Sequence, residues 1–561
     1  MRPLEYIVFL GLVVGLAWPV GVYLACVFQR RPTLLDPALR PIESLLHRLL
    51  RNRGQEMTAR VYALCFLLFS AVSTGGLFLL LLIQRWLPGG PSGQYLTTPM
   101  TADLAANTAI SFSTTTTWQA YAGETTLRYL TQLFGLVSQN FLAGAAGLAI
   151  GIAFIRGFSR ERSSTVGNFW VDLIRALLWV LLPVALVGSV VLVWQGVPLN
   201  IAPYTQAHTL EGAVQTIAQG PVAALEFIKN LGTNGGGFFN ANGAHPFEAP
   251  TPLVNFLAML AIAVLPAALT ITFGRMIGKP RAGWTLLAVM VVLFMGGLAL
   301  CDLAESASPP QLANLHVAGG NLEGKEVRFG IGGSVLAAVV TSNGATGSYN
   351  SMHDSYQPLG VLVPLVNMLL GEVIFGGLGT GLYSMVMIAL VAVFLGGLMI
   401  GRTPEYLGKK MTAAETRLTV LYALLTPAVV LVLSGLAIAT NAGRAGLVTN
   451  TGTRGFTEIL FAYASSMANN GQTMAGLNAN TVFYNWTTAV AMLVGRFGLA
   501  VLALALAGRF AAQRRWPTTS GTLPSDSTMF GVLVLGTVLL VGALSFLPAL
   551  ALGPIAEALQ H

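Results

Sequence analysis

The sequence predicts an all-α polytopic membrane protein with ten transmembrane helices, and three observations support this class. The chain of 561 residues is 54% hydrophobic and only 9% charged, and its mean hydropathy is +0.69. Soluble domains carry about 25% charged residues, so a soluble fold is excluded. Ten apolar runs approach the roughly 20 residues that cross a bilayer. The third observation is an order of elements that recurs four times.

The ten runs are the predicted transmembrane helices. They cover residues 6–28, 61–83, 127–155, 173–194, 253–273, 284–301, 359–400, 418–440, 482–507 and 529–552. The seventh run is too long for one straight transmembrane helix and has no loop suitable for two. We therefore expect it to form a broken helix.

The net charge of +8 reflects orientation in the membrane more than binding of nucleic acid. Of the 30 Lys and Arg residues, 21 lie in the alternate connections 29–60, 156–175, 275–281, 402–417 and 509–515. The positive-inside rule places these connections in the cytoplasm and both termini outside. In the first of them we expect Pro37 and Pro41 to break the chain early. The basic piece 41–51 then lies at the membrane surface or docks a partner.

The recurring order is a span, a short apolar half-helix, a small-polar loop and a second span. The half-helices are predicted at 97–111, 212–229, 331–340 and 456–464. The loops that follow are loop 1 (112–119), loop 2 (232–237), loop 3 (345–350) and loop 4 (468–472). Thr117, Gly235, Gly347 and Gly471 are equivalent points, spaced by 118, 112 and 124 residues. Such internal repetition predicts four re-entrant loops around one axis, as in potassium channels, with one extra helix at each end.

The repeats divide the chain into six parts. These are 1–60 (first helix and basic loop), 61–172, 173–283, 284–417 and 418–516 (repeats 1 to 4, the third with the broken helix), and 517–561 (last helix).

The chemistry of the four loops favours a filter for a monovalent cation. No loop contains an ionised residue, whereas a carboxylate would bind too tightly and admit divalent ions. Glycine lets several backbone carbonyls turn toward one point, and such carbonyls replace the hydration shell of a dehydrated ion. Each half-helix would also point the negative end of its dipole at the same place. The alternative is that these are four ordinary polar external loops.

Two charged residues fall inside predicted spans. Glu372 lies in the seventh run and Arg496 in the ninth. Because a charge in the membrane is costly, each needs a partner; either they pair with each other, or both line one aqueous vestibule below the filter. The glycines beside Glu372, among them Gly376, Gly377 and Gly379, indicate a gate, or else simply close helix packing.

Two histidines follow the second and third loops. Neither His245 nor His353 has a second His or Cys at metal-ligand spacing. We expect both to brace the loops by hydrogen bonds, with metal binding as the weaker alternative.

The sequence contains no machinery for hydrolysing nucleotides. It has neither a GxxxxGK[ST] phosphate loop nor an Asp-Lys-Thr-Gly motif. Energy for active transport must therefore come from a partner or an ion gradient.

Four strings identify a resemblance over essentially the whole chain. They are WQAYAGE at 118–124, NLGTNGGGFFNANGAHPFE at 230–248, SMHDSY at 351–356 and NNGQTMAGLNAN at 469–480. With the four repeats, they resemble the KdpA family, the potassium-binding subunits of the bacterial Kdp potassium-transporting ATPase. The resemblance implies a multi-pass protein of the bacterial inner membrane, in contact with lipid. It also implies three partners: a P-type ATPase catalytic subunit, a small periplasm-facing subunit and a small single-span subunit.

The resemblance also implies which residues bind potassium and how the ion moves on. The filter residues are Thr115, Thr116, Thr117, Gln119, Thr233, Asn234, Gly235, Gly236, Ala345, Thr346, Gly347, Ser348, Ala468, Asn469, Asn470 and Gly471. Glu372 and Arg496 match the vestibule charges of the family, and potassium would pass through a water-filled tunnel to the ATPase subunit. One departure stands out: Thr114–Thr117 replaces the usual alternation of asparagine with threonine and so loses an amide.

Three hypotheses of function follow. The first is the ion-selecting, non-hydrolytic subunit of an ATP-driven potassium pump. The second is a stand-alone potassium uptake protein with the same repeat, driven by a gradient. The third is a structural membrane subunit whose loops bind no ion.

Overall fold

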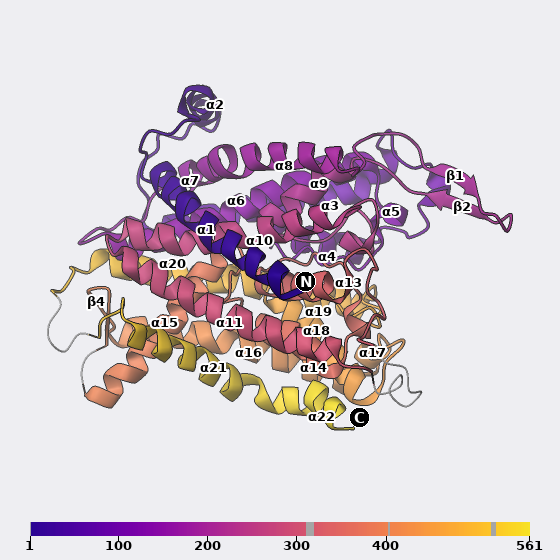
Figure 1. The fold of residues 1–561 in the computed structure, drawn as a ribbon. Coiled ribbons are helices and arrows are strands. Elements are labelled where there is room, and N and C mark those ends of the chain that lie inside the picture. The colour runs from indigo at the N-terminus through magenta and orange to yellow at the C-terminus, as the bar shows by residue number, and fades with distance from the viewer. Residues whose placement is uncertain (1, 310–318, 402–403, 518–522, 561) are drawn as a thin grey trace.

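The computed structural model describes residues 2–309, 319–401, 404–517 and 523–560. Long helices run roughly side by side in one bundle, and the two termini lie on the side away from α2 and β4 (Figure 1). The predicted ten spans are confirmed: in the described residues, ten helical stretches are long and apolar enough to cross a membrane. Each buries only part of its surface, as expected of helices that face both protein and lipid.

The spans begin and end close to the predicted runs. They are α1 (Arg2–Phe28), α3 (Ala59–Ile83), η3 with α6 (Thr131–Val137, Ser138–Ser159), α7 with η4 and α8 (Phe169–Arg175, Ala176–Leu181, Leu182–Trp194), α10 (Pro252–Met276), α11 (Pro280–Ser306), α15 (Thr380–Ile400), α16 (Ala413–Ala439), α19 with η7 and α20 (Val482–Leu493, Val494–Gly498, Leu499–Ala512), and α21 with η8 and α22 (Thr528–Leu550, Ala551–Ile555, Ala556–Gln560). The seventh run is broken as predicted, because α14 (Pro358–Leu369) and α15 are separated by the non-helical residues 370–379.

A half-helix precedes each loop; the first begins five residues later than predicted, and the second prediction was wrong in its bounds. The half-helices are α4 (Ala102–Ser113), α9 (Val222–Leu231), α13 (Gly330–Asn343) and α18 (Gly452–Met467). In the second repeat we predicted a helix from 212, but β1 (Thr205–His208) pairs with β2 (Val214–Ile217) in an external hairpin. The helix begins only after Gly220 and Pro221, since a proline suits the start of a helix.

The first basic connection also differs from the prediction. Pro37 and Pro41 do not break it: both lie within α2 (Asp36–Leu49), which stands apart from the bundle in Figure 1. Pro37 occupies the first turn, where no backbone donor is needed. Leu45 and Leu49 stay 55% and 70% exposed on this helix.

The remaining elements are short and belong to connections. They are η1 (Gln84–Trp86), η2 (Gly93–Tyr95), α5 (Gly123–Thr126), η5 (Asn242–Ala244), η6 (His353–Ser355), β3 (Glu405–Tyr406), β4 (Lys409–Lys410) and α17 (Asn441–Arg444).

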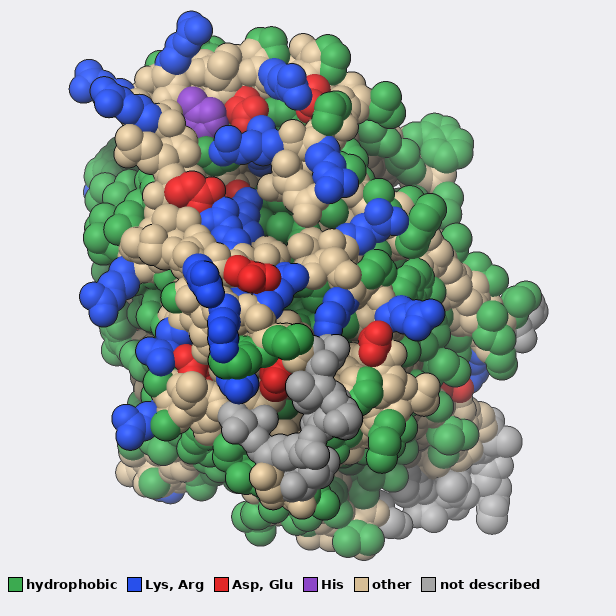
Figure 2. Space-filling view, turned by 90° about the vertical axis from the view of Figure 1, so that its left-hand side faces the viewer, with side chains coloured by type: hydrophobic (Ala, Val, Ile, Leu, Met, Phe, Trp, Pro, Cys, Tyr) green, Lys and Arg blue, Asp and Glu red, His purple; other side chains and the backbone are tan. Residues whose placement is uncertain are grey.

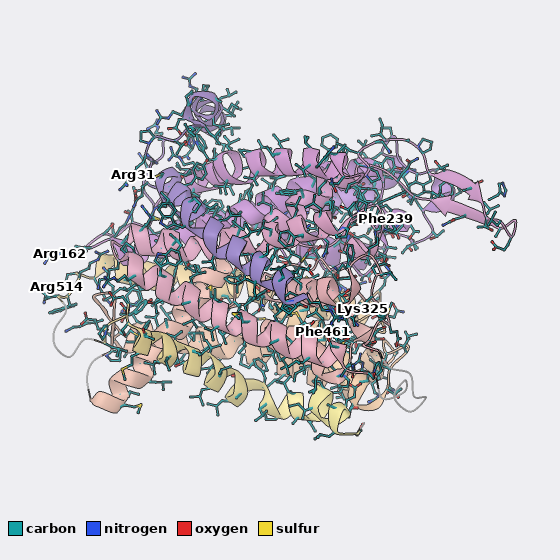
Figure 3. All side chains as sticks on the ribbon, viewed as in Figure 1. Arg31, Arg162, Phe239, Lys325, Phe461 and Arg514 are labelled. Carbon is teal, nitrogen blue, oxygen red and sulfur yellow. The ribbon has the colours of Figure 1, made fainter. Side chains whose placement is uncertain are left out.

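Basic side chains gather at one end of the bundle. Figure 3 labels Arg31, Arg162 and Arg514 at the same end, and Figure 2 shows Lys and Arg spread over this face. Such a gathering is typical of a cytoplasmic surface. It supports the predicted orientation, which stays a prediction.

The first span is held against the fifth by close backbone packing at Gly21. A Cβ at Gly21 would lie 2.7 Å from the carbonyl of Ala268 and 2.7 Å from Cβ of Ile271. The hydroxyl of Thr272 on α10 donates to the Gly21 carbonyl at 3.1 Å. The first span is therefore packed on α10 through a glycine.

We expect Gly21→Ala to destabilise the chain by about 1–3 kcal/mol, because the added methyl group overpacks this contact. Thermal unfolding of the purified protein in detergent measures the change. Gly11→Ala on the same helix is the matched control, since no atom lies within 4 Å of its added Cβ. Equal midpoints for the two variants would contradict the prediction.

Candidate ion-binding site

All four half-helices end in the same unusual turn. The first residue after each helix cap has a positive φ: 63° at Thr115, 49° at Thr233, 50° at Ala345 and 55° at Asn469. Glycine normally occupies this left-handed position after a helix, and other residues are strained there. Four such turns at equivalent points confirm the register predicted from Thr117, Gly235, Gly347 and Gly471.

Each half-helix also holds its own loop by the same backbone contact. The acceptor is the carbonyl four residues before the strained turn. These bonds are Thr117 N–H to Ser111 (3.0 Å), Asn234 and Gly235 N–H to Lys229 (2.9 and 3.0 Å), Thr346 N–H to Thr341 (3.2 Å) and Asn470 N–H to Ser465 (2.9 Å). The loops therefore begin as tight continuations of the helices.

Loop 1 joins loop 2 through side chains. The Thr117 hydroxyl donates to the Asn234 carbonyl at 2.6 Å. The Gln119 amide both accepts from Gly237 N–H (2.8 Å) and donates to the Gly237 carbonyl (3.1 Å). Gln119 thus bridges two loops, and its role in binding an ion stays a prediction.

Loop 2 joins loop 3 through backbone alone. Gly235 and Gly347 form a parallel bridge, with Gly236 N–H bonded to the Gly347 carbonyl at 3.3 Å. A Cβ at Gly235 would lie 2.1 Å from Gly347 N. Only glycine permits this approach.

Loop 4 closes the ring. A Cβ at Gly347 would lie 2.7 Å from the Asn470 carbonyl, and one at Gly471 would lie 2.1 Å from the Thr116 carbonyl. The Asn469 amide donates to the Thr116 hydroxyl at 3.0 Å. The four loops therefore form one closed ring, called the loop ring below.

The remaining predicted filter residues lie in the same buried loops. Thr346 and Ser348 are buried in loop 3, and Ala468 caps α18. Gly236 packs against loop 1, since its Cβ would lie 3.2 Å from the Thr117 carbonyl.

The ring offers neutral oxygens to an ion. In the part of the chain that the structure describes, no hydrogen bond ends on the backbone carbonyls of Thr115, Thr233, Ala345 and Asn469. A buried carbonyl without a partner is costly unless another group satisfies it. A dehydrated monovalent cation is such a group, and the carbonyl ends of the four half-helices add negative potential.

The broken part of the seventh run touches three of the four loops. Leu378 N–H donates to the Thr233 hydroxyl at 2.9 Å. A Cβ at Gly377 would lie 2.8 Å from Cβ of Ala345. The Asn470 amide donates to Oε1 of Glu372 at 3.5 Å. Residues 370–379 therefore pack directly against the ring, a contact that the sequence did not indicate.

Glycines fold this broken segment tightly. A Cβ at Gly376 would lie 1.8 Å from the Glu372 carbonyl, and one at Gly379 would lie 2.1 Å from the Gly147 carbonyl on α6. Glu372 itself has φ 57° and is 1% exposed. The segment is thus a strained, buried turn anchored on α6.

The predicted pairing of Glu372 with Arg496 is wrong. In the described residues no ion pair joins them, because each side chain has other partners. Arg496, in the π-helical turn η7, donates to the Ala143 carbonyl (3.0 Å) and to the Thr380 hydroxyl (3.3 Å). It therefore ties α6 to the start of α15. That both charges line one vestibule stays a prediction.

The two histidines differ in their roles. Nδ1 of His245 accepts from Phe247 N–H at 3.1 Å, a local bond beyond the end of loop 2, so a bracing role of His245 toward loop 2 stays a prediction. His353 was wrongly expected to do the same, since neither ring nitrogen has a hydrogen-bond partner among the described residues. Burial, then the charge on Lys325, lowers the pKa of His353 to about 3, so the ring is neutral. No group of three or more His, Cys, Asp or Glu that could hold a metal ion occurs in the described chain.

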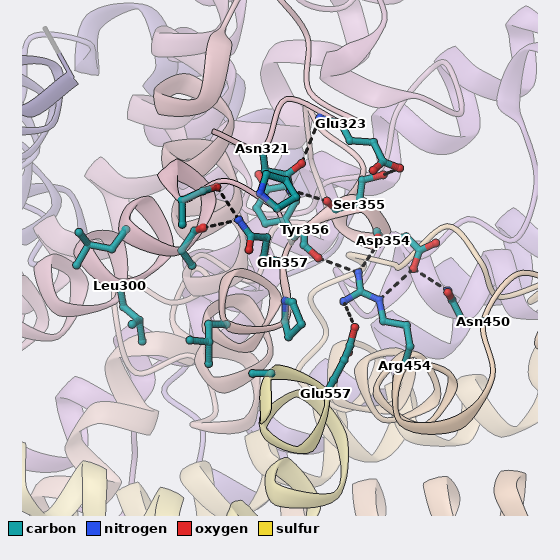
Figure 4. Close-up of a pocket in the computed structure, with 17 residues that line it drawn as sticks. Leu300, Asn321, Glu323, Asp354, Ser355, Tyr356, Gln357, Asn450, Arg454 and Glu557 are labelled. Atoms are coloured by element: carbon teal, nitrogen blue, oxygen red, sulfur yellow. Dashed lines mark hydrogen bonds and ion pairs between the residues drawn. The ribbon is translucent and has the colours of Figure 1, made fainter. Parts of the chain in front are cut away.

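A separate cavity of about 600 Å³ lies beside the start of α18 and contains none of the loop-ring residues. Figure 4 shows Arg454 among the residues that line it, paired with Asp354 at 3.6 Å and with Glu557 at 3.3 Å. These bonds tie η6, which follows loop 3, to α18 and α22. The cavity is therefore distinct from the candidate ion site.

Similarity to known proteins identifies the family of this chain. The family model described as potassium-transporting ATPase A subunit, KdpA, matches residues 7–559. The chain belongs to the KdpA family. Two relatives are each named potassium-transporting ATPase potassium-binding subunit. The one from Methylorubrum extorquens is 51% identical, over 98% of this chain and 95% of that protein. The one from Acidobacterium capsulatum is 49% identical, over 98% and 97%.

A solved structure supports the fold of this KdpA-family chain. The potassium transporter TrkH from Vibrio parahaemolyticus matches with a TM-score of 0.54 and 14% identity. The match covers 89% of this chain and 99% of TrkH. At this identity the likeness concerns the fold alone, and it confirms the predicted class.

We expect Thr233→Val to loosen residues 370–379, because the isosteric side chain leaves Leu378 N–H buried without an acceptor, at a cost of about 1–3 kcal/mol. Hydrogen exchange of this segment, followed by mass spectrometry, measures the loss of protection. Thr233→Ser keeps the hydroxyl and serves as the control. Unchanged exchange in the valine variant would show that this bond does not hold the segment.

Proposed function

We propose that this KdpA-family chain selects potassium with the loop ring and passes it downward to an ATP-hydrolysing partner. It is the potassium-binding, non-hydrolytic subunit of a potassium-transporting ATPase, a multi-pass membrane protein that transports K⁺ as its substrate. The observation that supports the filter most directly is the closure of four loops around neutral oxygens.

The donor set of the ring suits potassium. Every polar group that the four loops offer is a carbonyl, a hydroxyl or an amide, and the ring contains no carboxylate. Neutral oxygens bind an alkali ion firmly enough to replace its water, yet release it. The backbone contacts at Gly235, Gly347 and Gly471 fix the size of the ring, so a smaller ion gains less from it.

Below the ring, Glu372 supplies the first fixed negative charge. Its Oε2 has no hydrogen-bond partner among the described residues and would lie 3.9 Å from a Cβ at Gly377. The amides of Asn140 and Asn343 are likewise buried without partners in the described chain. Such groups favour water. The proposed vestibule, gated by Gly376, Gly377 and Gly379, receives the ion here, and Arg496 fixes its wall.

In this proposal the other subunits of the complex supply the energy for transport and the path that potassium follows beyond this chain. The proposed partners are a P-type ATPase catalytic subunit, a small periplasm-facing subunit and a small single-span subunit, all in the bacterial inner membrane. Both termini would face the periplasm. The six-part division of the chain into repeats belongs to the same proposal.

A stand-alone, gradient-driven uptake protein is the second candidate, because the sequence has no nucleotide-hydrolysing motif and an ion gradient is the other source of energy. Potassium flux into vesicles separates the two: a chain that transports without its ATPase partners is of the second kind.

We expect Gly235→Asp to reduce discrimination of potassium over sodium by at least about tenfold. The new side chain collides with the backbone of Gly347 and places a charge in the ring. ATP hydrolysis by the purified complex, stimulated by K⁺ or by Na⁺, measures the ratio. Gly93→Asp adds the same charge in an external turn with no atom within 4 Å of its Cβ. A normal ratio in Gly235→Asp would mean that the loop ring is not the filter.

We expect Glu372→Gln to slow potassium transport by about tenfold while leaving the K⁺ to Na⁺ ratio intact. The ion would still be selected above, but it would lose the charge that draws it downward. Flux of ⁸⁶Rb⁺ through the complex in liposomes measures the rate. A rate equal to that of the unmodified complex would remove Glu372 from the path.

A further inference from the structure

Three buried charges lie behind loop 2, and the proposed function so far does not use them. Nζ of Lys229 lies 2.6 Å from Oε2 of Glu226 and 2.5 Å from Oε2 of Glu248. The three side chains are between 0% and 3% exposed. Buried ions of this kind are expensive, so their retention beside the ring calls for a reason.

The position of Lys229 in the repeat gives a reason for keeping these buried charges. Ser111, Thr341 and Ser465 occupy the same position in the other half-helices, four residues before the strained turn. Each of these hydroxyls bonds to a loop residue: Ser111 donates to the Trp118 carbonyl (2.9 Å), Ser465 accepts from Gly471 N–H (3.0 Å), and Thr341 accepts from the Gln472 amide. In repeats 1, 3 and 4 a neutral side chain therefore holds a loop directly.

In repeat 2 two charged side chains, those of Lys229 and Glu248, hold the loop instead of one neutral side chain. The carbonyl of Lys229 accepts from Asn234 and Gly235, at the start of loop 2. Its ammonium group binds Glu248, and Oε1 of Glu248 accepts from Phe239 N–H at 2.8 Å, just beyond the end of loop 2. Lys229 and Glu248 thus connect the two ends of the loop.

We propose that Glu248 is a positioning residue that, through Lys229 and Phe239, fixes the width of loop 2 and so the discrimination of potassium from sodium. The inference rests on the proposed function of the loop ring. Loop 2 needs such a clamp because glycine fills three successive positions, 235–237, and glycine leaves the backbone the most freedom.

Glu226 provides the matched comparison. It also binds Lys229, but it lies on the same half-helix, where it accepts a hydrogen bond from the Asn230 amide at 3.2 Å. Glu226→Gln and Glu248→Gln each replace one of the two carboxyl groups that contact the same ammonium group with an amide. Only the second weakens the connection across the loop.

The test uses the whole purified complex, with the K⁺ and Na⁺ concentrations for half-maximal ATP hydrolysis as the readout. We expect Glu248→Gln to raise the K⁺ concentration for half-maximal hydrolysis by about tenfold and so bring it closer to the Na⁺ concentration. We expect Glu226→Gln to change the K⁺ concentration and the ratio of the two concentrations by less than about twofold. Asp172→Asn is the control: Asp172 is 2% exposed and pairs with Arg156 between α6 and α7, at the basic end.

Each other outcome overturns the inference. Equal effects of the two variants would mean that charge alone matters, and a lowered melting temperature with an unchanged ratio would mean a purely structural role. If Glu248→Gln does not assemble, Glu248→Asp keeps the charge but shortens the reach, and a normal ratio in it would also overturn the inference. A complex of the unmodified chain without K⁺-stimulated hydrolysis would instead overturn the proposed function itself.

Discussion

The structure depends on how closely four loop backbones approach one another. Cβ atoms at Gly235, Gly347 and Gly471 would each fall between 2.1 and 2.7 Å from an atom of the next loop, which is closer than any side chain allows. This contact sets the depth at which all four half-helices end, because each helix runs straight into its loop. The spans, in turn, only have to hold the half-helices at that depth. A single backbone constraint therefore determines both the ring and the arrangement of the repeats around it.

Charge is kept out of the ring and placed in its supports. Glu372 lies against the inner side of the ring, Arg496 ties α6 to α15, and Lys229 sits behind loop 2 between two carboxylates. Each ion is costly at membrane depth and has its own contacts. In the proposed function, neutral oxygens bind and release the ion, while the charged groups fix the geometry of the ring or attract the ion onward.

The sequence predicted the spans, the broken seventh helix and the register of the four loops, because hydropathy and repetition depend on local composition. It could not predict contacts between distant segments. Leu378 reaches Thr233 only through the folded chain, and Glu372 bonds to Asn470 instead of Arg496. The strained turns at Thr115, Thr233, Ala345 and Asn469 also escaped detection, since glycine, the usual marker of a positive φ, is absent there. Glu226, Lys229 and Glu248 could have been noticed in the sequence, because these charged residues flank a loop that contains no charged residue.

The all-threonine loop 1 finds its explanation in the neighbouring loops. Threonine in place of asparagine loses an amide donor at this corner, but the Asn469 amide of loop 4 reaches across to the Thr116 hydroxyl. The Thr117 hydroxyl donates to Asn234 on the other side, and the Thr114 and Thr116 hydroxyls bond to each other at 2.8 Å. The Thr116 and Thr117 hydroxyls thus hold loop 1 to its two neighbours, and the Thr114 hydroxyl bonds within loop 1. At this corner, as at the other three, the carbonyl of the residue after the helix cap accepts no hydrogen bond in the described chain, so in the proposed filter loop 1 offers the same kind of oxygen as the other loops.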